Sequence, residues 1–500
     1  MPGFFDQLSE RLRTLFYSRG QFFMDVTTVL SGALISRVIA VLAIPILARI
    51  YTPSEFGLLA VFMTINAIAS AIACLRFEMA IVLPEDDGEA YLLLKMSLVF
   101  AAITAAFSFG FFMVFGDHLA VMMGVPELNQ LFWLSALSIW LIGVFNACQS
   151  WASRTGQFLS ISKSTVGGTL GTVVSQILLG LAQNILTSGL VIGQALGRLV
   201  QSGQLYLACR TSWARLSGVG FSFSRCRALF VRYKNFPLYD SLASLLNASS
   251  RELPVLMLGL FFTPAVIGYY SLGRRMLKVP MQLIDNAISR VFFPKAREEM
   301  SNGKLGQLVY TVFCKLAIIG VVPMLIVIVA APAIVAVFLG PNWVESVVYI
   351  QWLSVWLVVG FIATPFAQLF NVLELQRARL RYQTVLMLAR FLALLIGGLQ
   401  QDPVLAVAAF SIVSAVISLL NCLWLLSKSG LSYQAPIRIL FVETLYAVPF
   451  VAAAVICMLW FNSSLIELLC VVCVLAIFAR LRMVQVLDQA YLLPPKRGAR

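Results

Sequence analysis

Long apolar runs, separated by short polar segments, follow one another along nearly the whole chain of 500 residues. About 20 apolar residues in a helix cross a bilayer core about 30 Å thick, where each backbone amide must be satisfied within its own segment. Apolar residues make up 60% of the chain and charged residues 12%, about half the charge of a soluble protein. The sequence therefore predicts an all-α polytopic membrane protein. It excludes a cytosolic enzyme, a disordered chain and a secreted disulfide scaffold.

Fourteen runs are long enough to span a membrane. They cover residues 26–49, 56–82, 92–115, 131–151, 162–183, 187–209, 236–260, 264–291, 308–339, 346–373, 380–400, 403–427, 438–461 and 464–482. Short cytoplasmic loops of membrane proteins are rich in Lys and Arg. If the N-terminus is cytoplasmic, most basic residues fall in inside segments and none falls in an outside loop. We expect about 14 transmembrane helices with both termini in the cytoplasm.

Cysteine and histidine patterns argue against a metal or catalytic centre. Of nine cysteines, only Cys470 and Cys473 have a metal-ligand spacing. Both lie in an apolar run, where we interpret them as small hydrophobic core residues. The sequence has a single histidine, His118, and it lacks a Walker loop, an HExxH motif and a large soluble domain. We expect no enzyme, no cofactor and no metal ion, apart from a coupling H⁺ or Na⁺.

A short motif occurs twice, 211 residues apart. Thr52-Pro53 matches Thr263-Pro264, and Gly57 matches Gly268. Parallel repeats are a transporter architecture in which the substrate binds between two lobes. The predicted organisation is an N-terminal six-helix lobe over 1–209, a basic cytoplasmic linker over 210–235, a C-terminal six-helix lobe over 236–427, and two further helices with a cytoplasmic tail over 428–500. Alternatively, the motif is a recurrent turn that precedes a helix.

Polar side chains follow one helix face in each of two neighbouring spans. The first face carries Asp240, Ser244, Asn247 and Arg251, and the second carries Arg274, Lys278, Gln282, Asp285 and Ser289. Further intramembrane charges are Arg37, Arg198, Glu252, Arg275, Lys315 and Arg390. An ionisable group inside a membrane is costly and faces protein or water, so the two stripes predict a wet cavity.

The charge balance of that cavity indicates the ligand. Cations outnumber the three acids Asp240, Glu252 and Asp285, which favours an anion, and guanidinium groups match phosphate oxygens geometrically. Each acid could bind a coupling proton or sodium ion, or could stay ionised beside Arg251 or Lys278. Arg198 and Lys315 could instead snorkel or form structural pairs.

Two blocks of sequence resemble a known family. The stretch from Leu30 to Glu89 contains RIYTPSEFGLLAVF and CLRFEMAIVLPEDDGE, and the second runs from Pro237 to Phe293. Both resemble oligosaccharide flippases of the multidrug/oligosaccharidyl-lipid/polysaccharide (MOP) superfamily, in particular the Wzx-type lipopolysaccharide O-antigen or exopolysaccharide translocases. The resemblance implies two six-helix bundles that form a V around a cationic cavity.

The same resemblance implies a function. A protein of this kind moves undecaprenyl-pyrophosphate-linked oligosaccharide across the bacterial inner membrane, from the cytoplasmic to the periplasmic leaflet, by alternating access coupled to an ion gradient. The expected pyrophosphate contacts are Arg37, Arg251, Arg274, Arg275 and Lys278, and the expected coupling or tuning groups are Asp240, Glu252 and Asp285. Expected partners are the lipid-linked oligosaccharide, membrane lipids, a polysaccharide polymerase and a chain-length regulator, without nucleic acid.

Two alternatives follow from the same sequence. A drug/cation antiporter of the MOP superfamily would need acidic rather than basic cavity residues. A membrane glycan polymerase or ligase would be expected to carry a larger loop than the longest one here, about 25 residues.

Overall fold

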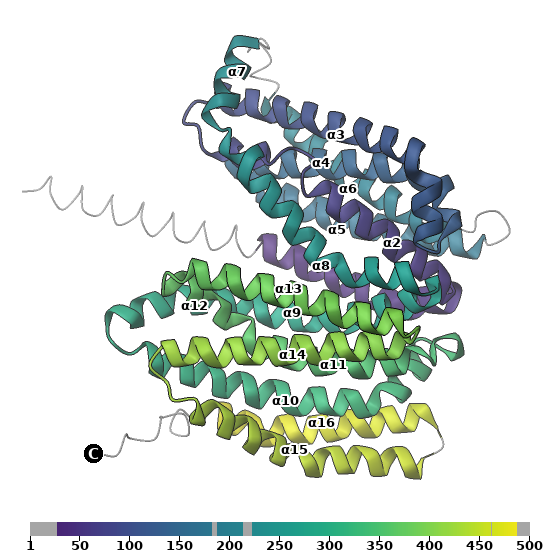
Figure 1. Ribbon diagram of the computed structural model, residues 1–500, viewed down its shortest axis with the longest axis vertical. Helices are drawn as coiled ribbons and strands as arrows, with labels where there is room; N and C mark the ends of the chain where they lie inside the picture. Colours follow the sequence, from purple (N-terminus) through teal and green to yellow (C-terminus); the bar gives the residue numbers. More distant parts are fainter. Residues whose placement is uncertain (1–27, 183–187, 214–222, 462, 488–500) are drawn as a thin grey trace, which may run out of the picture. The chain divides into compact units, whose positions relative to one another are not determined.

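The computed structural model describes residues 28–182, 188–213, 223–461 and 463–487, with every regular element in these ranges helical (Figure 1). The described residues form two compact units. The N-terminal unit comprises the residues up to Tyr51 together with Leu58–Leu256, and the C-terminal unit comprises Thr52–Gly57 and the residues from Met257 onward.

The described part of the N-terminal unit is built of helices. They are a first helix Thr28–Ile50, α2 (Pro53–Ser70), α3 (Asp87–Met122), α4 (Phe132–Arg154), α5 (Phe158–Leu181), α6 (Gly189–Trp213), α7 (Phe223–Arg232) and α8 (Ser241–Phe261). Three short helical turns are η1 (Phe77–Val82), η2 (Pro126–Leu131) and η4 (Phe236–Asp240). The first residues of α2 and the last residues of α8 belong to the C-terminal unit.

The C-terminal unit contains the remaining helices. They are α9 (Pro264–Ser301), α10 (Leu305–Phe338), η5 (Pro341–Trp343), α11 (Ser346–Ala363), η6 (Pro365–Gln368), α12 (Leu369–Val372), α13 (Gln376–Leu399), α14 (Pro403–Lys428), α15 (Gln434–Trp460) and α16 (Ser464–Leu487). An ion pair joins α15 to α16, because Arg482 Nη2 lies 2.8 Å from Glu443 Oε2 and both side chains are nearly buried. The guanidinium of Arg482 also lies 3.7 Å from the ring centre of Tyr446.

Eleven helices within the described ranges are long and apolar enough to cross a membrane. The chain is therefore an all-helical polytopic membrane protein, as predicted, whereas the count of fourteen is not confirmed. Helices α6, α8 and α9, with 25, 21 and 38 residues, are not among the eleven. These three helices carry Arg198, the Asn247/Arg251 pair and the Arg274/Lys278 pair, which lower their apolar content.

The predicted span 56–82 is not one helix. Helix α2 ends at Ser70, and the chain turns before η1. Leu75 and Arg76 both have positive φ, at 48° and 62°, a conformation that no right-handed helix can contain. The predicted span 346–373 likewise ends early, because α11 stops at Ala363 and η6 begins at Pro365. Proline lacks the backbone N–H that would continue the helix.

Small residues bring α5 and α6 into close contact. A Cβ atom built on Gly197 would lie 1.7 Å from Thr172 Oγ1, and one built on Gly193 would lie 2.5 Å from Gln176 Cγ. Glycines four residues apart let two membrane helices approach closely. This contact fixes the position of the residue that follows Gly197, which is Arg198.

The two copies of the repeated motif lie against each other in the C-terminal unit. A Cβ atom on Gly57 would meet the carbonyl oxygen of Pro264 at 1.9 Å, and one on Gly268 would meet that of Pro53 at 1.9 Å. Each copy thus places its glycine on the proline of the other. Only glycine allows such a close backbone approach, which explains why both copies retain it at the same position.

Candidate functional site

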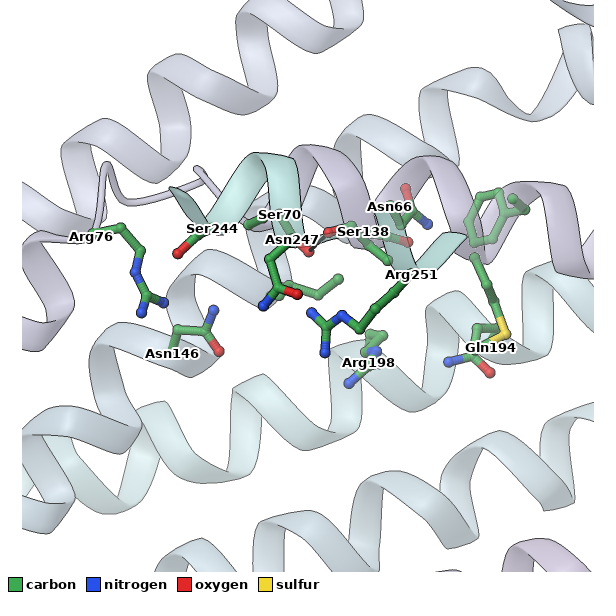
Figure 2. Close-up of a pocket in the computed structure, with 15 residues that line it drawn as sticks. Asn66, Ser70, Arg76, Ser138, Asn146, Gln194, Arg198, Ser244, Asn247 and Arg251 are labelled. Carbon is green, nitrogen blue, oxygen red and sulfur yellow. Dashed lines mark hydrogen bonds between the residues drawn. The ribbon is translucent and has the colours of Figure 1, made fainter. Parts of the chain in front are cut away.

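A polar cavity of about 440 Å³ lies within the N-terminal unit (Figure 2). Helices α2, α4, α6 and α8 line it, together with the turn that follows α2. Its polar residues are Asn66, Ser70, Arg76, Ser138, Asn146, Gln194, Arg198, Ser244, Asn247 and Arg251, and its apolar ones are Phe62, Met63, Ala67, Ala71 and Ile142.

Helical spacing explains why these side chains meet. Ser138, Ile142 and Asn146 follow one another at intervals of four on α4, and Gln194 and Arg198 do so on α6. Residues three or four apart share one face of a helix. The spacing therefore brings polar side chains of α4 and α6 to the face that lines the cavity.

The cavity wall is cationic. It carries Arg76, Arg198 and Arg251, and none of its lining residues in the described part of the chain is a carboxylate. Arg198 Nη1 donates a hydrogen bond to Gln201 Oε1 at 2.8 Å, and no described carboxylate forms an ion pair with it. Figure 2 draws Arg198 and Arg251 near the centre of the view and Arg76 at its left.

Arg76 differs from Arg198 because two acids hold it. Its Nε donates to Asp240 Oδ2 at 2.8 Å, and its Nη1 lies 3.5 Å from Glu78 Oε1. Glu78 is only 4% exposed, and burial raises the pKa of its carboxyl above the ordinary value. Its backbone hydrogen bond and Arg76 lower that pKa, and the charge of Asp240 raises it. The positive charge at this end of the cavity is thus largely balanced.

Of the five predicted pyrophosphate contacts, Arg251 lines this cavity. Arg37 is half-buried on the first helix and does not line it. Arg274, Arg275 and Lys278 are half-buried on α9, in the C-terminal unit. Their role in substrate binding stays a prediction.

Two of the three predicted coupling acids have described side chains, and their environments differ. Asp240 forms the ion pair with Arg76, and Glu252 Oε2 accepts a hydrogen bond from Thr64 Oγ1 at 3.3 Å. Neither lines the cavity. The side chain of Asp285 lies outside the described residues.

Sequence reasoning missed part of this site. Arg76 is not among the predicted site residues, although the positive φ at that residue turns it into the cavity wall. The predicted site also lacks the amides Asn66, Asn146 and Gln194, because it is built on charged residues and on the polar faces of the spans 236–260 and 264–291. The spacing of four between polar residues in apolar helices, as on α4 and α6, is the signal that could have found them.

Another intramembrane cation, Arg390 on α13, contacts a hydroxyl group and two aromatic rings. Its Nε donates to Ser414 Oγ at 2.9 Å, and its guanidinium lies 5.0 and 5.3 Å from the ring centres of Trp356 and Phe410. Cation–π contacts of this kind stabilise a desolvated guanidinium. Arg390 is thus accounted for by packing.

Comparison with protein families decides where the chain belongs. The family described as "Polysaccharide biosynthesis protein" matches residues 46–348, which is more than half of the sequence. The chain belongs to this family. The match confirms the resemblance drawn from the two sequence blocks, and it covers all the cavity-lining residues.

Individual relatives agree with this assignment. The chain is 25% identical to the succinoglycan biosynthesis transport protein ExoT of Rhizobium meliloti over 323 residues, which are 64% of this chain and 61% of the relative. The matched region thus spans less than two thirds of that relative's length.

Two solved structures show the fold. The lipid II flippase MurJ in an inward closed conformation matches with a TM-score of 0.72, 13% identity and coverage of 92% of this chain and 99% of MurJ. An inward-facing multidrug resistance MATE family transporter of the MOP superfamily matches with a TM-score of 0.62, 15% identity and coverage of 79% and 94%. The family member therefore has the MOP fold.

Proposed function

We propose that this family member is a flippase that moves undecaprenyl-pyrophosphate-linked oligosaccharide from the cytoplasmic to the periplasmic leaflet of a bacterial inner membrane. It works by alternating access coupled to an ion gradient, and supplies lipopolysaccharide or exopolysaccharide assembly. The observation that carries the proposal is the cavity wall, with three arginines and no carboxylate among its described residues. The relatives named above are transport proteins, which agrees with the prediction that the chain is not an enzyme.

The chemistry of the wall fits a diphosphate. Guanidinium groups bind phosphate oxygens through two parallel hydrogen bonds, and such bonds are stronger where water is displaced. Arg198 has only an amide as its described side-chain partner, and Arg251 comes from the facing helix α8. A diphosphate between these two helices would replace the hydration of both cations.

Fourteen crossings are part of this proposal. The eleven apolar helices together with α6, α8 and α9 make fourteen (11 + 3). At about 1.5 Å per residue, each of the three is long enough to cross the apolar core. Their polar stripes are tolerated where they line a wet cavity. Both termini then lie in the cytoplasm, and the proposed lobes are residues 1–209 and 236–427, joined by a basic linker.

Two groups of residues belong to the same proposal. Arg37, Arg274, Arg275 and Lys278 are further pyrophosphate contacts, and Asp240, Glu252 and Asp285 couple transport to the ion gradient or tune the cavity. The polymerase and the chain-length regulator that receive the glycan act after translocation.

The test is the Arg198→Gln/Arg251→Gln double variant in a strain that lacks the wild-type gene. Surface polysaccharide should fall more than tenfold, while the amount of protein in the membrane stays unchanged. Arg227→Gln is the matched control, because Arg227 is an exposed residue of α7 outside the cavity. Full polysaccharide from the double variant would refute the headgroup site. Drug resistance conferred by the protein would favour the antiporter alternative.

A further inference from the structure

Another cavity, of about 530 Å³, lies in the C-terminal unit where α15 begins. Helix α10 lines it through Tyr310, and the turn before α15 lines it through Ser432. The α15 residues in its wall are Gln434, Ala435, Arg438, Ile439, Val442 and Glu443. These α15 residues lie beyond the part of the chain that the family matches, 46–348, and outside the proposed transport site. The cavity therefore calls for an account of its own.

This cavity lies at the depth of lipid headgroups. Helix α15 has 27 residues and is one of the eleven apolar spanning helices. At about 1.5 Å per residue it is about 40 Å long, about 10 Å longer than the apolar core of a bilayer, so its first residues extend into the headgroup layer. Further along the helix, Phe441 is 70% exposed and Leu445 is 61% exposed, as expected of side chains that contact acyl chains.

The charges of the wall favour an anion. Arg438 is exposed, and none of the ion pairs between described side chains involves it. Glu443, the carboxylate among the described lining residues, is 5% exposed and forms an ion pair with Arg482. The negative charge of Glu443 is therefore balanced, whereas the positive charge of Arg438 is left for a ligand.

The start of α15 adds hydrogen-bond donors to the same wall. The N-cap residue Tyr433 makes no side-chain hydrogen bond to the helix, and the N–H groups of a first turn carry partial positive charge. Ser432 Oγ accepts the backbone N–H of Gln434 at 3.4 Å and keeps its own proton to donate. Side chains on a helix lean towards its N-terminus, which directs Arg438 towards the headgroup layer.

We propose that this cavity binds one anionic phospholipid, with its phosphate at Arg438 and its acyl chains along Ile439 and Val442. Guanidinium groups bind phosphate oxygens strongly, and basic pockets between membrane helices bind anionic headgroups. An amine in the headgroup would compete with Arg482 for Glu443. The headgroup that fits is therefore a polyol, as in phosphatidylglycerol, whose hydroxyl groups can pair with Ser432.

The bound lipid completes the packing of α15 against α10. Deeper in the membrane the two helices share one apolar cluster, in which Val322 and Ala447 are fully buried. At the headgroup end the cavity has Tyr310 on one wall and Arg438 on another, so a lipid there contacts both helices. The lipid thus stabilises the C-terminal helices. This role goes beyond the proposed function, because it concerns a resident lipid rather than the transported one.

The experiment measures lipid binding to the delipidated full-length protein in detergent, with the thermal midpoint as a second readout. The probes are phosphatidylglycerol and phosphatidylethanolamine with the same acyl chains. Wild type should bind phosphatidylglycerol more tightly and gain thermal stability from it. Arg438→Gln should weaken phosphatidylglycerol about fivefold, as expected for one basic group at a membrane surface. It should leave the affinity for phosphatidylethanolamine unchanged.

Two further variants sharpen the test. Ala435→Phe fills the cavity and keeps Arg438, so it should abolish the preference for phosphatidylglycerol without changing the charge. Arg381→Gln is the matched control, because Arg381 is an exposed arginine near the start of another spanning helix, α13, and does not line the cavity. This control should change neither lipid affinity.

The lipid is distinguished from a free anion by adding inorganic phosphate or glycerol 3-phosphate alone. Neither should raise the thermal midpoint, because neither contacts the apolar part of the wall, and a rise equal to that with phosphatidylglycerol would refute the lipid site. Equal affinity of wild type for the two lipids, an unchanged preference in Arg438→Gln and Ala435→Phe, or an equal loss in Arg381→Gln would refute it as well. Arg198→Gln should leave the phosphatidylglycerol affinity intact, which separates this site from the proposed transport site.

Discussion

Arg198 and Arg390 look alike in sequence and differ in structure. Each is an arginine inside a long helix, and each donates one hydrogen bond to a neutral side chain, Gln201 in one case and Ser414 in the other. Arg198 lines a polar cavity, whereas the aromatic rings of Trp356 and Phe410 cover Arg390. A charge within a membrane helix is therefore not by itself a binding site. What covers the charged group decides its role.

The sharpest test of this difference replaces each arginine by methionine. One variant should lose transport and the other should lose stability. Arg198→Met should lower transport of lipid-linked oligosaccharide more than tenfold, with little loss of thermal stability, because the cavity loses a proposed phosphate contact and no packing. Arg390→Met should leave transport per folded molecule within about twofold. It should lower the free energy of unfolding by about 1–2 kcal/mol, through loss of the cation–π contacts and the bond to Ser414.

Transport is measured as surface polysaccharide divided by the amount of folded protein in the membrane, and stability as the thermal midpoint in detergent. Wild type and Arg227→Gln give the reference values. If Arg390→Met abolishes transport at normal stability, Arg390 contacts substrate and the comparison is wrong.

A second prediction concerns how Arg198 is positioned. Gly197→Ala introduces a Cβ atom that would lie 1.7 Å from Thr172 Oγ1 and 2.8 Å from Gly168 O, so α5 and α6 must move apart. Overpacking of this kind costs about 1–3 kcal/mol. Transport should fall further than stability alone explains, because the next residue along the helix is Arg198.

Gly203→Ala is the matched control on the same helix. A Cβ atom there would have no neighbour within 4 Å, and alanine is a better helix former than glycine by about 0.5–1 kcal/mol. It should leave transport unchanged and stability equal or slightly higher. Equal effects of the two alanine variants on transport and thermal midpoint would show that the close contact does not position the cation.

Much of the fold could be predicted from the sequence, because the thickness of the bilayer sets how many consecutive apolar residues a spanning helix needs. The ends of most helices fall within a few residues of the predicted spans, for example α14 at Pro403–Lys428 against 403–427. The early end of α2 could not be predicted, since no proline or glycine occurs between Ser70 and Phe77. The turn depends instead on positive φ at Leu75 and Arg76. Tertiary packing, not local preference, stabilises that turn.

The candidate site was predicted less completely. The stripe on α8 correctly indicated that Ser244, Asn247 and Arg251 share a face, and all three line the cavity. Which helices face that stripe depends on tertiary packing and cannot be read from spacing. The place of Arg76 in the cavity wall could not be predicted either, because it also depends on tertiary packing. Its ion-pair partner Asp240 lies 164 residues further along the chain.

The smallest predicted effect concerns the acids that hold Arg76. Because burial raises the pKa of Glu78 above its ordinary value of 4.5, the folded protein keeps this proton at pH values where the unfolded chain has lost it. The contribution of Glu78 to stability is therefore complete below pH 4.5 and is lost as the pH rises through the raised pKa of the folded state. The slope from one group cannot exceed about 1.4 kcal/mol per pH unit.

Glu78→Gln removes the titrating proton and should flatten the decline in thermal midpoint above pH 4.5, while the contact with Arg76 is weakened. Glu89→Gln is the control, since Glu89 also pairs with an arginine, Arg232, but is partly exposed. If the Glu78→Gln profile keeps the wild-type slope, the buried carboxyl does not titrate in this range and the prediction is wrong. The contrast with Arg198 would then rest on Asp240, which forms the 2.8 Å ion pair with Arg76, whereas no described carboxylate forms an ion pair with Arg198.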